Sequence, residues 1–572
     1  MMKSFFCFLV LVASVAAVLI SAAIQPVLAA QAPAPVALTG EVRSNEEGPM
    51  EGVLVSAKKA GSTITITVVS DAQGHYSFPR TKLDPGSYLL KIRAVGYELN
   101  DPGFVEVTAQ KKAQVDLRLR KTLDLAAQLT NAEWLMSAPG TWDQKRTVRY
   151  CVNCHTLERI FRTDYTAADM NWVVARMNGY NNATTPLRPL LVTRAVAGAR
   201  SEDRDGPSGF PKGVGEYLST VNLSSSTTWQ YPLKTFPRPK GKATWVIMTE
   251  YDLPRRHQQP HDVVLDSKGA VWYSDFERPM MGRLDPRTAK VVEYQVPSIK
   301  PGGQPFGIRK LTIDYQDNPW INLGSQGAVG KFNRETEKFQ TWSIPKPAGA
   351  QREPGTCCVE ALHMQVDGKA WVLLDGNRVQ RFDVKTGEWL QEPIDVFKDL
   401  PKDSPAFGRD HGIYDIYSDS RNNLFLTDYM TEVIGLIDSK TLKVAFYLLP
   451  TARSYPRRGH VDNQDRFWFG EYQGNRIGMV DPKKGEVKEW EVPTPYSWTY
   501  DAVYDKNGEV WSGGMTSDRI ARLNPKTSEF IEYLLPRSTN VRLVEVDNST
   551  TPVTFWVGSN HGASIVKLET LE

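Results

Sequence analysis

Between residues 36 and 120, apolar and polar residues alternate in short runs that turn residues separate. The runs VALTGEVRS, EGVLVSAKKA, STITITVVSDAQGHYSF and GSYLLKIRAVGY have the period of two that is typical of half-buried β-strands. Asp and Gly stand in SDAQGHYSF and LDPGSYLLKI, where tight turns need them. The pattern predicts a small antiparallel β-sandwich over residues 36–120.

In residues 121–235 the apolar residues recur at helical spacing instead. The segments LDLAAQLTNAEWLM, DMNWVVARMNGY and GVGEYLSTVN each predict a helix, and the Pro-rich YPLKTFPRPKGKA predicts a linker. We therefore expect a small all-α domain between two β-rich parts.

From residue 243 to the end, the chain repeats a unit whose aromatic residue begins a strand. These aromatics stand 43 to 54 residues apart, at Trp272, Trp320, Trp371, Phe425, Trp468, Trp511 and Trp556. A period of this length with four short strands indicates a β-propeller. The seventh unit ends without its fourth strand, and VIMTEYDLP at residues 246–254 supplies it. We predict a seven-bladed propeller over 243–572, closed by this pairing; an open array or a six-bladed ring is the alternative.

The fold class is therefore mainly β. The net charge and the N-terminal residues then indicate which partners and which compartment to expect. Lys+Arg 68 against Asp+Glu 65 gives a net charge of +3, which argues against nucleic acid as a partner. One lysine precedes a long apolar run that ends in small residues, so residues 1–30 read as a secretory signal cut after Ala29 or Ala30. Residues 5–24 as an uncleaved anchor are the alternative. We expect a periplasmic or secreted protein with no membrane contact after cleavage.

The segment YCVNCHTLERI carries the most specific chemistry. In C-x-x-C-H, two cysteines hold a heme c by thioether bonds and the histidine binds its iron, so Cys151, Cys154 and His155 predict one covalent heme. Zinc would need four ligands, and residues 121–235 hold no second Cys/His pair. A thiol redox motif would sit in a βαβ pattern rather than among helices. Heme c is the interpretation that fits best.

A sixth iron ligand is expected from a methionine, whose sulfur raises the reduction potential. Met177 ends WVVARM on an amphipathic helix and is the predicted ligand. Met170 is the alternative, and both side chains could instead belong to the core.

Histidines and carboxylates recur in the propeller units. We interpret three histidines as starting the innermost strands of blades 1, 4 and 5, with a carboxylate three residues after the repeat aromatic of the same blade: His261, His411 and His460 with Asp275, Asp428 and Glu471. We expect them to converge on one funnel mouth as catalytic groups, where they could bind a hard cation such as Mg²⁺ or move a proton. His561 lies near the corresponding place in blade 7. Polar side chains that merely line a wet channel are the alternative.

Cys357 and Cys358 are adjacent and enter the blade 3 strand. In an oxidising compartment they can form a strained vicinal disulfide, which would stiffen a funnel-mouth loop or be redox-active. Two free buried thiols are the alternative.

Two of the three parts resemble known families through specific residues. Residues 36–120 resemble the carboxypeptidase regulatory-like (transthyretin-like) domain at Gly40, Gly52, Val53, Val55, Asp71, Gly74, Tyr76, Phe78, Pro85, Gly86, Tyr88, Gly96 and Tyr97. The segment CVNCHTLERI with NWVVARM is similar to small monoheme cytochrome c domains found beside periplasmic oxidoreductase propellers.

The propeller resembles the streptogramin B lyase (virginiamycin B lyase) family in PHDVVLDSKGAVWYSDF, DRFWFGEYQGNRIGMVD and NGEVWSGGMTSDRIARLNP. The resemblance implies elimination that opens a cyclic depsipeptide, with a histidine base and a magnesium ion. His460 and Glu471 match the lyase His and Glu most closely, whereas Gly470 and Gln473 depart from the lyase-like repeat.

These observations favour an exported heme c protein, a periplasmic oxidoreductase in which the propeller funnel binds a small-molecule substrate and the heme passes electrons to a periplasmic electron carrier. A Mg-dependent C–O lyase acting on a cyclic depsipeptide-like substrate is one alternative, and a binding or sensory platform with a cytochrome is another. Elimination needs no electron carrier, so a fused heme favours the oxidoreductase. No dinucleotide fingerprint or P-loop appears, so NAD and ATP are not expected.

Overall fold

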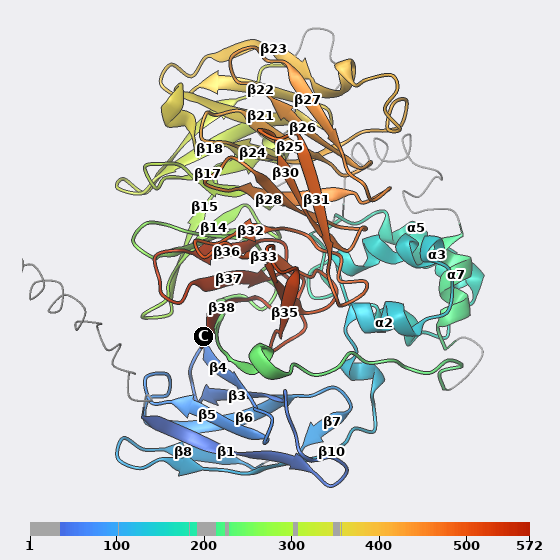
Figure 1. Ribbon diagram of the computed structural model, residues 1–572, viewed down its shortest axis with the longest axis vertical. Helices are drawn as coiled ribbons and strands as arrows, with labels where there is room; N and C mark the ends of the chain where they lie inside the picture. Colours follow the sequence, from blue (N-terminus) through green and yellow to red (C-terminus); the bar gives the residue numbers. More distant parts are fainter. Residues whose placement is uncertain are drawn as a thin grey trace, which may run out of the picture.

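A computed structural model describes residues 35–100, 102–181, 183–191, 213–223, 228–300, 307–346, 355 and 357–572. The predicted signal and its cleavage site lie outside these residues. Within them, no helix is both long and apolar enough to cross a membrane. A β-sandwich, a helical segment and a β-propeller follow one another along the chain (Figure 1).

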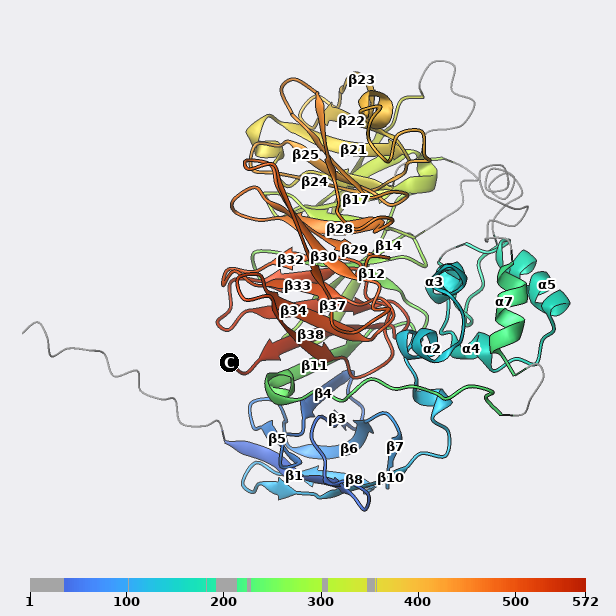
Figure 2. The same cartoon turned by 45° about the vertical axis from the view of Figure 1, so that its right-hand side comes forward.

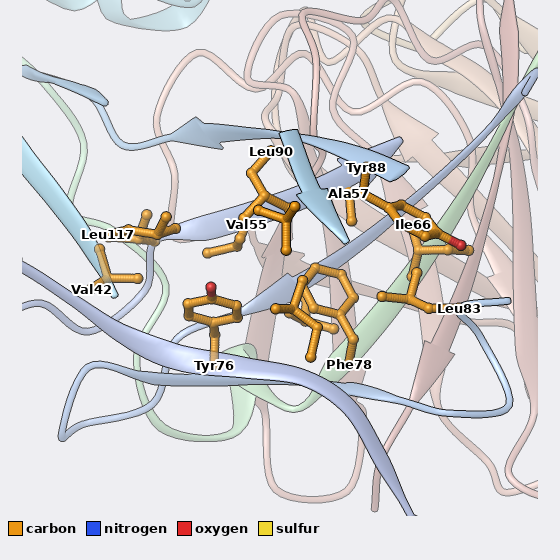
Figure 3. Packing of buried hydrophobic residues seen from close by; sticks show 14 of the residues in the cluster. Val42, Val55, Ala57, Ile66, Tyr76, Phe78, Leu83, Tyr88, Leu90 and Leu117 are labelled. Atoms are coloured by element: carbon orange, nitrogen blue, oxygen red, sulfur yellow. The ribbon is translucent and has the colours of Figure 1, made fainter. Parts of the chain in front are cut away.

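The first part is the predicted sandwich. One sheet is built on β1 and the other has the order β4-β3-β6-β8. Tyr76 and Phe78 on β5 point toward Val55 and Leu90 of the facing sheet, and all four side chains are buried (Figure 3). The strands are β1 (Val36–Ser44), β2 (Gly48–Pro49), β3 (Leu54–Lys59), β4 (Ile64–Val69), β5 (His75–Pro79), β6 (Gly86–Arg93), β7 (Tyr97–Leu99), β8 (Phe104–Val107), β9 (Ala113–Gln114) and β10 (Leu117–Lys121).

The helical segment lies beside the propeller (Figure 2). Capping boxes at Thr130, Thr141 and Thr166 fix the starts of three helices, because each threonine satisfies a backbone N–H that the helix leaves unpaired. The expectation of helices here is confirmed. They are η1 (Ala126–Gln128), α2 (Asn131–Ser137), α3 (Trp142–Arg146), η2 (Thr147–Asn153), α4 (Glu158–Phe161), α5 (Ala167–Met177) and α7 (Val214–Val221).

Seven sheets of propeller strands follow in the described residues, which confirms the predicted blade number. Blades 1 to 3 are β12 (Pro260–Leu265), β13 (Val271–Asp275), β14 (Met280–Asp285) and β15 (Lys290–Gln295); β16 (Leu311–Ile313), β17 (Pro319–Leu323), β18 (Ala328–Asn333) and β19 (Lys338–Ser343); and β20 (Cys358–Glu360), β21 (Lys369–Asp375), β22 (Arg378–Asp383) and β23 (Trp389–Asp395). Blades 4 to 6 are β24 (Ile413–Ser418), β25 (Leu424–Asp428), β26 (Val433–Ile437) and β27 (Val444–Leu448); β28 (Pro456–Val461), β29 (Phe467–Glu471), β30 (Arg476–Asp481) and β31 (Glu486–Glu491); and β32 (Val503–Tyr504), β33 (Val510–Gly513), β34 (Arg519–Asn524) and β35 (Glu529–Leu534). Short 3₁₀ turns lie at η3 (Gly241–Thr244), η4 (Gly324–Gln326), η5 (Met364–Val366) and η6 (Val396–Asp399).

Blade 7 closes the ring as predicted and then continues into the sandwich. Its own strands are β36 (Val544–Asp547), β37 (Thr554–Ser559) and β38 (Ser564–Thr570), and β11 (Val246–Asp252) pairs with β38 as the fourth strand. The other edge of β11 pairs antiparallel with β4, so that blade and sandwich share one eight-stranded sheet. The sequence predicted the closure but not this extension.

A buried hydrogen bond explains why an acidic residue and an aromatic residue recur together. In blade 1 the Nε1–H of Trp272 donates to Asp266 Oδ2 at 3.0 Å, and the same bond forms six residues apart in three other blades. A buried indole N–H needs an acceptor, so the turn carboxylate and the strand tryptophan act as one unit. The further pairs are Asp314 with Trp320, Asp462 with Trp468 and Asp505 with Trp511.

Candidate functional site

Two rings of side chains line the start of the inner strands. In each blade the repeat aromatic pairs with one residue of the inner strand. The residue three positions before that paired residue belongs to what we name the mouth ring: His261, Arg309, Cys357, Tyr414, Arg457, Tyr500 and Arg542. The next residue in each blade belongs to the axis ring: Asp262, Lys310, Cys358, Asp415, Arg458, Asp501 and Leu543. The mouth ring contains three arginines and no carboxylate, whereas the axis ring contains three aspartates and two cations.

The register of the inner strands shifts at these rings. Irregular pairing occurs between Pro260 and Val263, and at the same place in blades 4 and 5. A β-bulge re-aims side chains and is common next to active sites. In each of the three blades the irregular stretch contains both the mouth residue and the axis residue.

Ion pairs across the propeller axis connect side chains of the axis ring that come from different blades. Arg458 NH1 lies 2.5 Å from Asp262 Oδ1, and Arg458 Nε lies 3.1 Å from Asp415 Oδ2. Lys310 Nζ donates to Asp415 Oδ1 at 3.0 Å, and the hydroxyl of Tyr417 donates to Asp415 Oδ2 at 2.8 Å. All these groups are buried, and buried charges are tolerated only when they are paired in this way. The network joins blades 1, 2, 4 and 5 directly beneath the mouth ring.

Phenols and guanidinium groups pack together in the mouth ring. The hydroxyls of Tyr414 and Tyr500 are hydrogen-bonded to each other, and Tyr500 also accepts hydrogen bonds from Arg542 at 3.1 Å and from Arg457 at 3.3 Å. The Arg457 guanidinium lies 3.8 Å from the centre of the Tyr472 ring. Among the described residues, the partners of these two arginines are hydroxyls, amides and aromatic rings rather than carboxylates.

This surplus of positive charge changes the acidity of a phenol. Burial acts to raise the pKa of Tyr500, but the guanidinium groups of Arg542, Arg457 and Arg458 outweigh it and lower the pKa to about 8. Burial raises the pKa of Tyr414 well above its usual range. The pKa values of the two hydrogen-bonded phenols are therefore shifted in opposite directions, and Tyr500 is the more acidic of the two.

The CVNCH segment lies against this mouth. Arg542 NH2 donates to Asn153 Oδ1 at 3.3 Å, and Asn540 Nδ2 donates to the carbonyl of Val152 at 2.9 Å. Val152 and Cys151 belong to the same apolar cluster as Tyr472 and Tyr500 of the propeller. His561 reaches the carbonyl of Asn153 through Nε2 at 3.2 Å, so the expected blade 7 histidine contacts the motif itself.

The motif residues fit a covalent heme. Cys151 and Cys154 form no disulfide, and burial raises the pKa of their thiols to about 12 and about 11. His155 Nδ1 lies 3.0 Å from the carbonyl of Thr156. A neutral imidazole that donates from Nδ1 keeps the lone pair on Nε2, the arrangement that metal-binding histidines use. Burial also lowers the pKa of His155, which favours this neutral form.

The structure separates the two candidate methionines. Met170 is buried in the helical core, whereas Met177 is half-buried at the last residue of α5. Met170 packs within this core, and the choice of Met177 over Met170 as the sixth ligand stays a prediction.

The three predicted histidines do not share one level. His261 is in the mouth ring, His460 is three positions further along its strand, and His411 precedes β24 altogether. Because a strand rises about 3.3 Å per residue, His261 and His460 are offset by about 10 Å along the strands. The expectation that all three histidines start an inner strand at one opening is wrong. The number of residues between the histidine and the repeat aromatic differs between the three blades, so the histidines stand at different positions along their strands.

Each histidine also has its own carboxylate. His261 Nδ1 lies 2.7 Å from Asp262 Oδ1, and burial lowers the pKa of His261 to about 4. His411 Nδ1 lies 2.6 Å from Asp428 Oδ2, the one expected pair that forms. His460 Nε2 lies 3.5 Å from Asp501 Oδ2, below the ion pairs of the axis ring.

Neither of the other two predicted carboxylates forms a hydrogen bond or an ion pair with its histidine among the described residues. Asp275 accepts from the backbone N–H of Gln259 and Glu277, and it pairs with Arg255 at 2.5 Å, so it holds a turn. Glu471 is fully buried, and a Cβ added at Gly478 would lie 2.9 Å from its Oε1. The Glu471 carboxyl therefore packs inside its own hairpin.

Burial also raises the pKa of Glu471 well above its usual range. Among the described residues, the carboxylate next to His460 is Asp501 rather than Glu471. In the described part of the chain, no group of three or more His, Cys, Asp or Glu could hold a metal ion. The cations that offset the buried carboxylates of the axis ring are the side chains Arg458 and Lys310, and Mg²⁺ binding stays a prediction.

Sequence reasoning missed the arginines and tyrosines of the mouth. A signal was present, because in five blades a turn aspartate stands six residues before the repeat aromatic, which is a phenylalanine in blade 4 and a tryptophan in the other four. Counting five residues back from Asp266, Asp314, Asp419, Asp462 and Asp505 gives His261, Arg309, Tyr414, Arg457 and Tyr500.

Comparison with known proteins bears on two of the three parts. Residues 402–570 match the Virginiamycin B lyase family. Residues 37–120 match the carboxypeptidase regulatory-like domain. No curated protein matches the chain.

Several solved structures align with part of the chain at low identity. A streptogramin B lyase is 22% identical over 57% of this chain and 99% of its own, with a TM-score of 0.46. Virginiamycin B lyase from Staphylococcus aureus is 21% identical over 57% of this chain and 100% of its own, with a TM-score of 0.46. A catalytically inactive variant of that enzyme with quinupristin is 22% identical over 57% of this chain and 100% of its own, with a TM-score of 0.45.

Proposed function

We propose that this protein is an exported heme c oxidoreductase that oxidises a small anionic substrate at the propeller mouth and delivers the electrons to a periplasmic carrier. The observation that carries the proposal is the contact between Arg542 of the mouth ring and Asn153, which stands between the two motif cysteines. Cys151 and Cys154 would hold the heme, with His155 on its iron, and the heme would supply one-electron transfer.

The mouth residues offer what such a substrate needs. Arg457 and Arg542 supply positive charge that no described carboxylate neutralises, so a negatively charged group is attracted to them. Tyr500, whose pKa is lowered to about 8, can in its phenolate form take a proton on Oη as the substrate loses electrons. The ion pairs beneath the mouth confine a ligand to the side that faces the CVNCH segment.

The test is heme reduction by small anionic reductants, followed in redox difference spectra of the purified protein. Tyr500→Phe should slow substrate-driven reduction by about a hundredfold, since a proton acceptor contributes on that scale. Chemical reduction by dithionite should be unchanged. Full retention of the substrate-driven rate in Tyr500→Phe would remove Tyr500 from the reaction, and no reduction by any anionic compound would count against the oxidoreductase.

A C–O lyase acting on a cyclic depsipeptide-like substrate is the second candidate, and the family match of residues 402–570 favours it. His460 beside Asp501 would be its base, and Mg²⁺ its predicted cation. His460→Ala separates the two proposals. The variant keeps heme reduction if the first is right, and it loses Mg²⁺-dependent ring opening of a streptogramin B if the second is right. A binding or sensory platform would show neither activity.

A further inference from the structure

Cys357 and Cys358 bring two sulfur atoms together at the mouth. Their Sγ atoms lie 2.6 Å apart, and they approach the carbonyl of Tyr414 at 3.6 Å and 3.5 Å. Cys358 is buried, whereas Cys357 is half-buried. A covalent S–S bond is about 2.0 Å long, so oxidation needs only a small further approach.

A disulfide between neighbours in the chain is strained. Consecutive Cα atoms are about 3.8 Å apart, which is less than the 4.4 Å at which ordinary disulfides begin. Strain of this kind makes a disulfide easier to reduce, so such a pair suits turnover rather than permanent cross-linking. Because Cys358 is buried and Cys357 is half-buried, Cys357 is the sulfur on the accessible side. Burial and the contact with Cys357 also raise the pKa of the Cys358 thiol well above its usual range.

A continuous set of contacts links this pair to the CVNCH segment. The backbone of Tyr414 contacts both sulfurs, and its hydroxyl bonds to that of Tyr500. Tyr500 accepts from Arg542 at 3.1 Å, and the same guanidinium donates to Asn153 at 3.3 Å. No other described cysteines lie outside the CVNCH motif.

We propose that Cys357 and Cys358 form a dithiol/disulfide couple that accepts electrons from a small anionic thiol. The choice of an anionic thiol follows from the composition of the mouth ring, which contains Cys357, three arginines and no carboxylate. The transfer of those electrons onward to the heme rests on the proposed function.

The chemistry balances in two stages. Two substrate thiols give one substrate disulfide, while the Cys357–Cys358 bond breaks and two cysteine S–H groups form. The cysteine disulfide then re-forms and two protons leave to solvent. The two electrons would pass one at a time to the heme that Cys151, Cys154 and His155 would hold, and from there to the periplasmic carrier.

The first experiment tests the couple without reference to the heme. Protein purified in air is denatured in iodoacetamide without reductant and digested. Mass spectrometry then gives the mass of the peptide that contains residues 357–358. We expect no alkylation, and two alkyl groups after treatment with dithiothreitol. Two alkyl groups on protein that had been incubated with diamide would overturn the couple.

The second experiment tests electron flow in full-length protein under anaerobic conditions. Mercaptosuccinate should reduce the heme faster than the cationic thiol cysteamine does, and Cys358→Ser should lose this reduction. Tyr414→Phe should slow heme reduction and leave the alkylation pattern unchanged, because it removes the hydroxyl contact but keeps the backbone at the sulfurs. Wild-type rates in Cys358→Ser would mean that thiols reach the heme directly and would overturn the relay. Purified protein without heme c would defeat the proposed function, while the alkylation result would still decide the couple.

Discussion

The guanidinium of Arg542, at the start of the inner strand of blade 7, hydrogen-bonds to Asn153, which stands between the two cysteines of the CVNCH motif. The two residues are 389 positions apart in the chain. Through this contact the helical segment lies directly against the propeller mouth. The same guanidinium reaches Tyr500, so one side chain joins the predicted heme attachment point to the mouth ring.

Replacing Arg542 with Ala should lower the free energy of unfolding by about 1 to 3 kcal/mol, because Tyr500 and Asn153 lose a buried charged donor. Chemical denaturation followed by tryptophan fluorescence measures the change. Arg421→Ala is the matched control, since that side chain is 62% exposed and should change stability by less than about 0.5 kcal/mol. Equal effects of the two variants would show that the Arg542 contacts add no stability.

Heme should remain attached after denaturation and should give a c-type pyridine spectrum. Cys151→Ala and Cys154→Ala should each weaken attachment, and His155→Ala should alter the iron spectrum because the proximal ligand is lost. Cys357→Ala controls for a general effect of removing a cysteine and should keep the heme. Met177→Ala should lower the reduction potential if Met177 is the sixth ligand. Complete extraction of heme by acid-acetone would contradict covalent attachment.

Breaking the axis ring should be costly. Asp262→Ala removes a partner of the fully buried Arg458 and should destabilise the protein by about 3 to 5 kcal/mol. The double variant Asp262→Leu with Arg458→Met should recover much of that loss, since it removes both charges together. Denaturant midpoints measure both effects. A single variant that costs less than about 1 kcal/mol would mean that water or another group replaces the ion pair.

The buried His261 should make the protein less stable in mild acid. Its pKa is lowered to about 4 by burial, below the value of about 6.5 in an unfolded chain. Between these values the unfolded chain binds more protons, so stability falls as pH falls from about 6.5 toward 4, by up to about 3 kcal/mol. His261→Gln should flatten the pH dependence of stability in this window, whereas the exposed His75→Gln should not. An unchanged slope in His261→Gln would assign the effect to other groups.

Deleting the sandwich should expose the edge of β11. The strand pairs with β4 from Ile64 to Thr67, and Lys58 and Lys82 add ion pairs to Asp252 and Glu569. An unpaired edge strand is a template for association, so the protein without residues 1–120 should aggregate. Light scattering and sedimentation measure the change. Lys58→Ala with Lys82→Ala tests these half-buried ion pairs alone and should leave the protein monodisperse. A monodisperse truncated protein would show that β11 needs no cover.

The sequence by itself determined the elements and the number of blades. Alternation, helical spacing and the recurring aspartate–tryptophan unit are local, and each depends on residues a few positions apart, as in Asp266 and Trp272. The missing fourth strand of the last unit also predicted ring closure, because an open propeller would leave an unpaired edge. The C-x-x-C-H spacing is equally local, and it named Cys151, Cys154 and His155 without any knowledge of their surroundings.

Only the tertiary structure decided which side chains meet. Bulges at the start of three inner strands placed Arg458 between Asp262 and Asp415, and offsets along the strands separated His261 from His460. The contact of Arg542 with Asn153 and the pairing of β4 with β11 join segments far apart in the chain. Such contacts depend on how rigid parts dock. Burial, charge pairing and the need to satisfy polar groups act between segments that are distant in the chain. A periodic pattern along one strand therefore cannot predict which side chains meet.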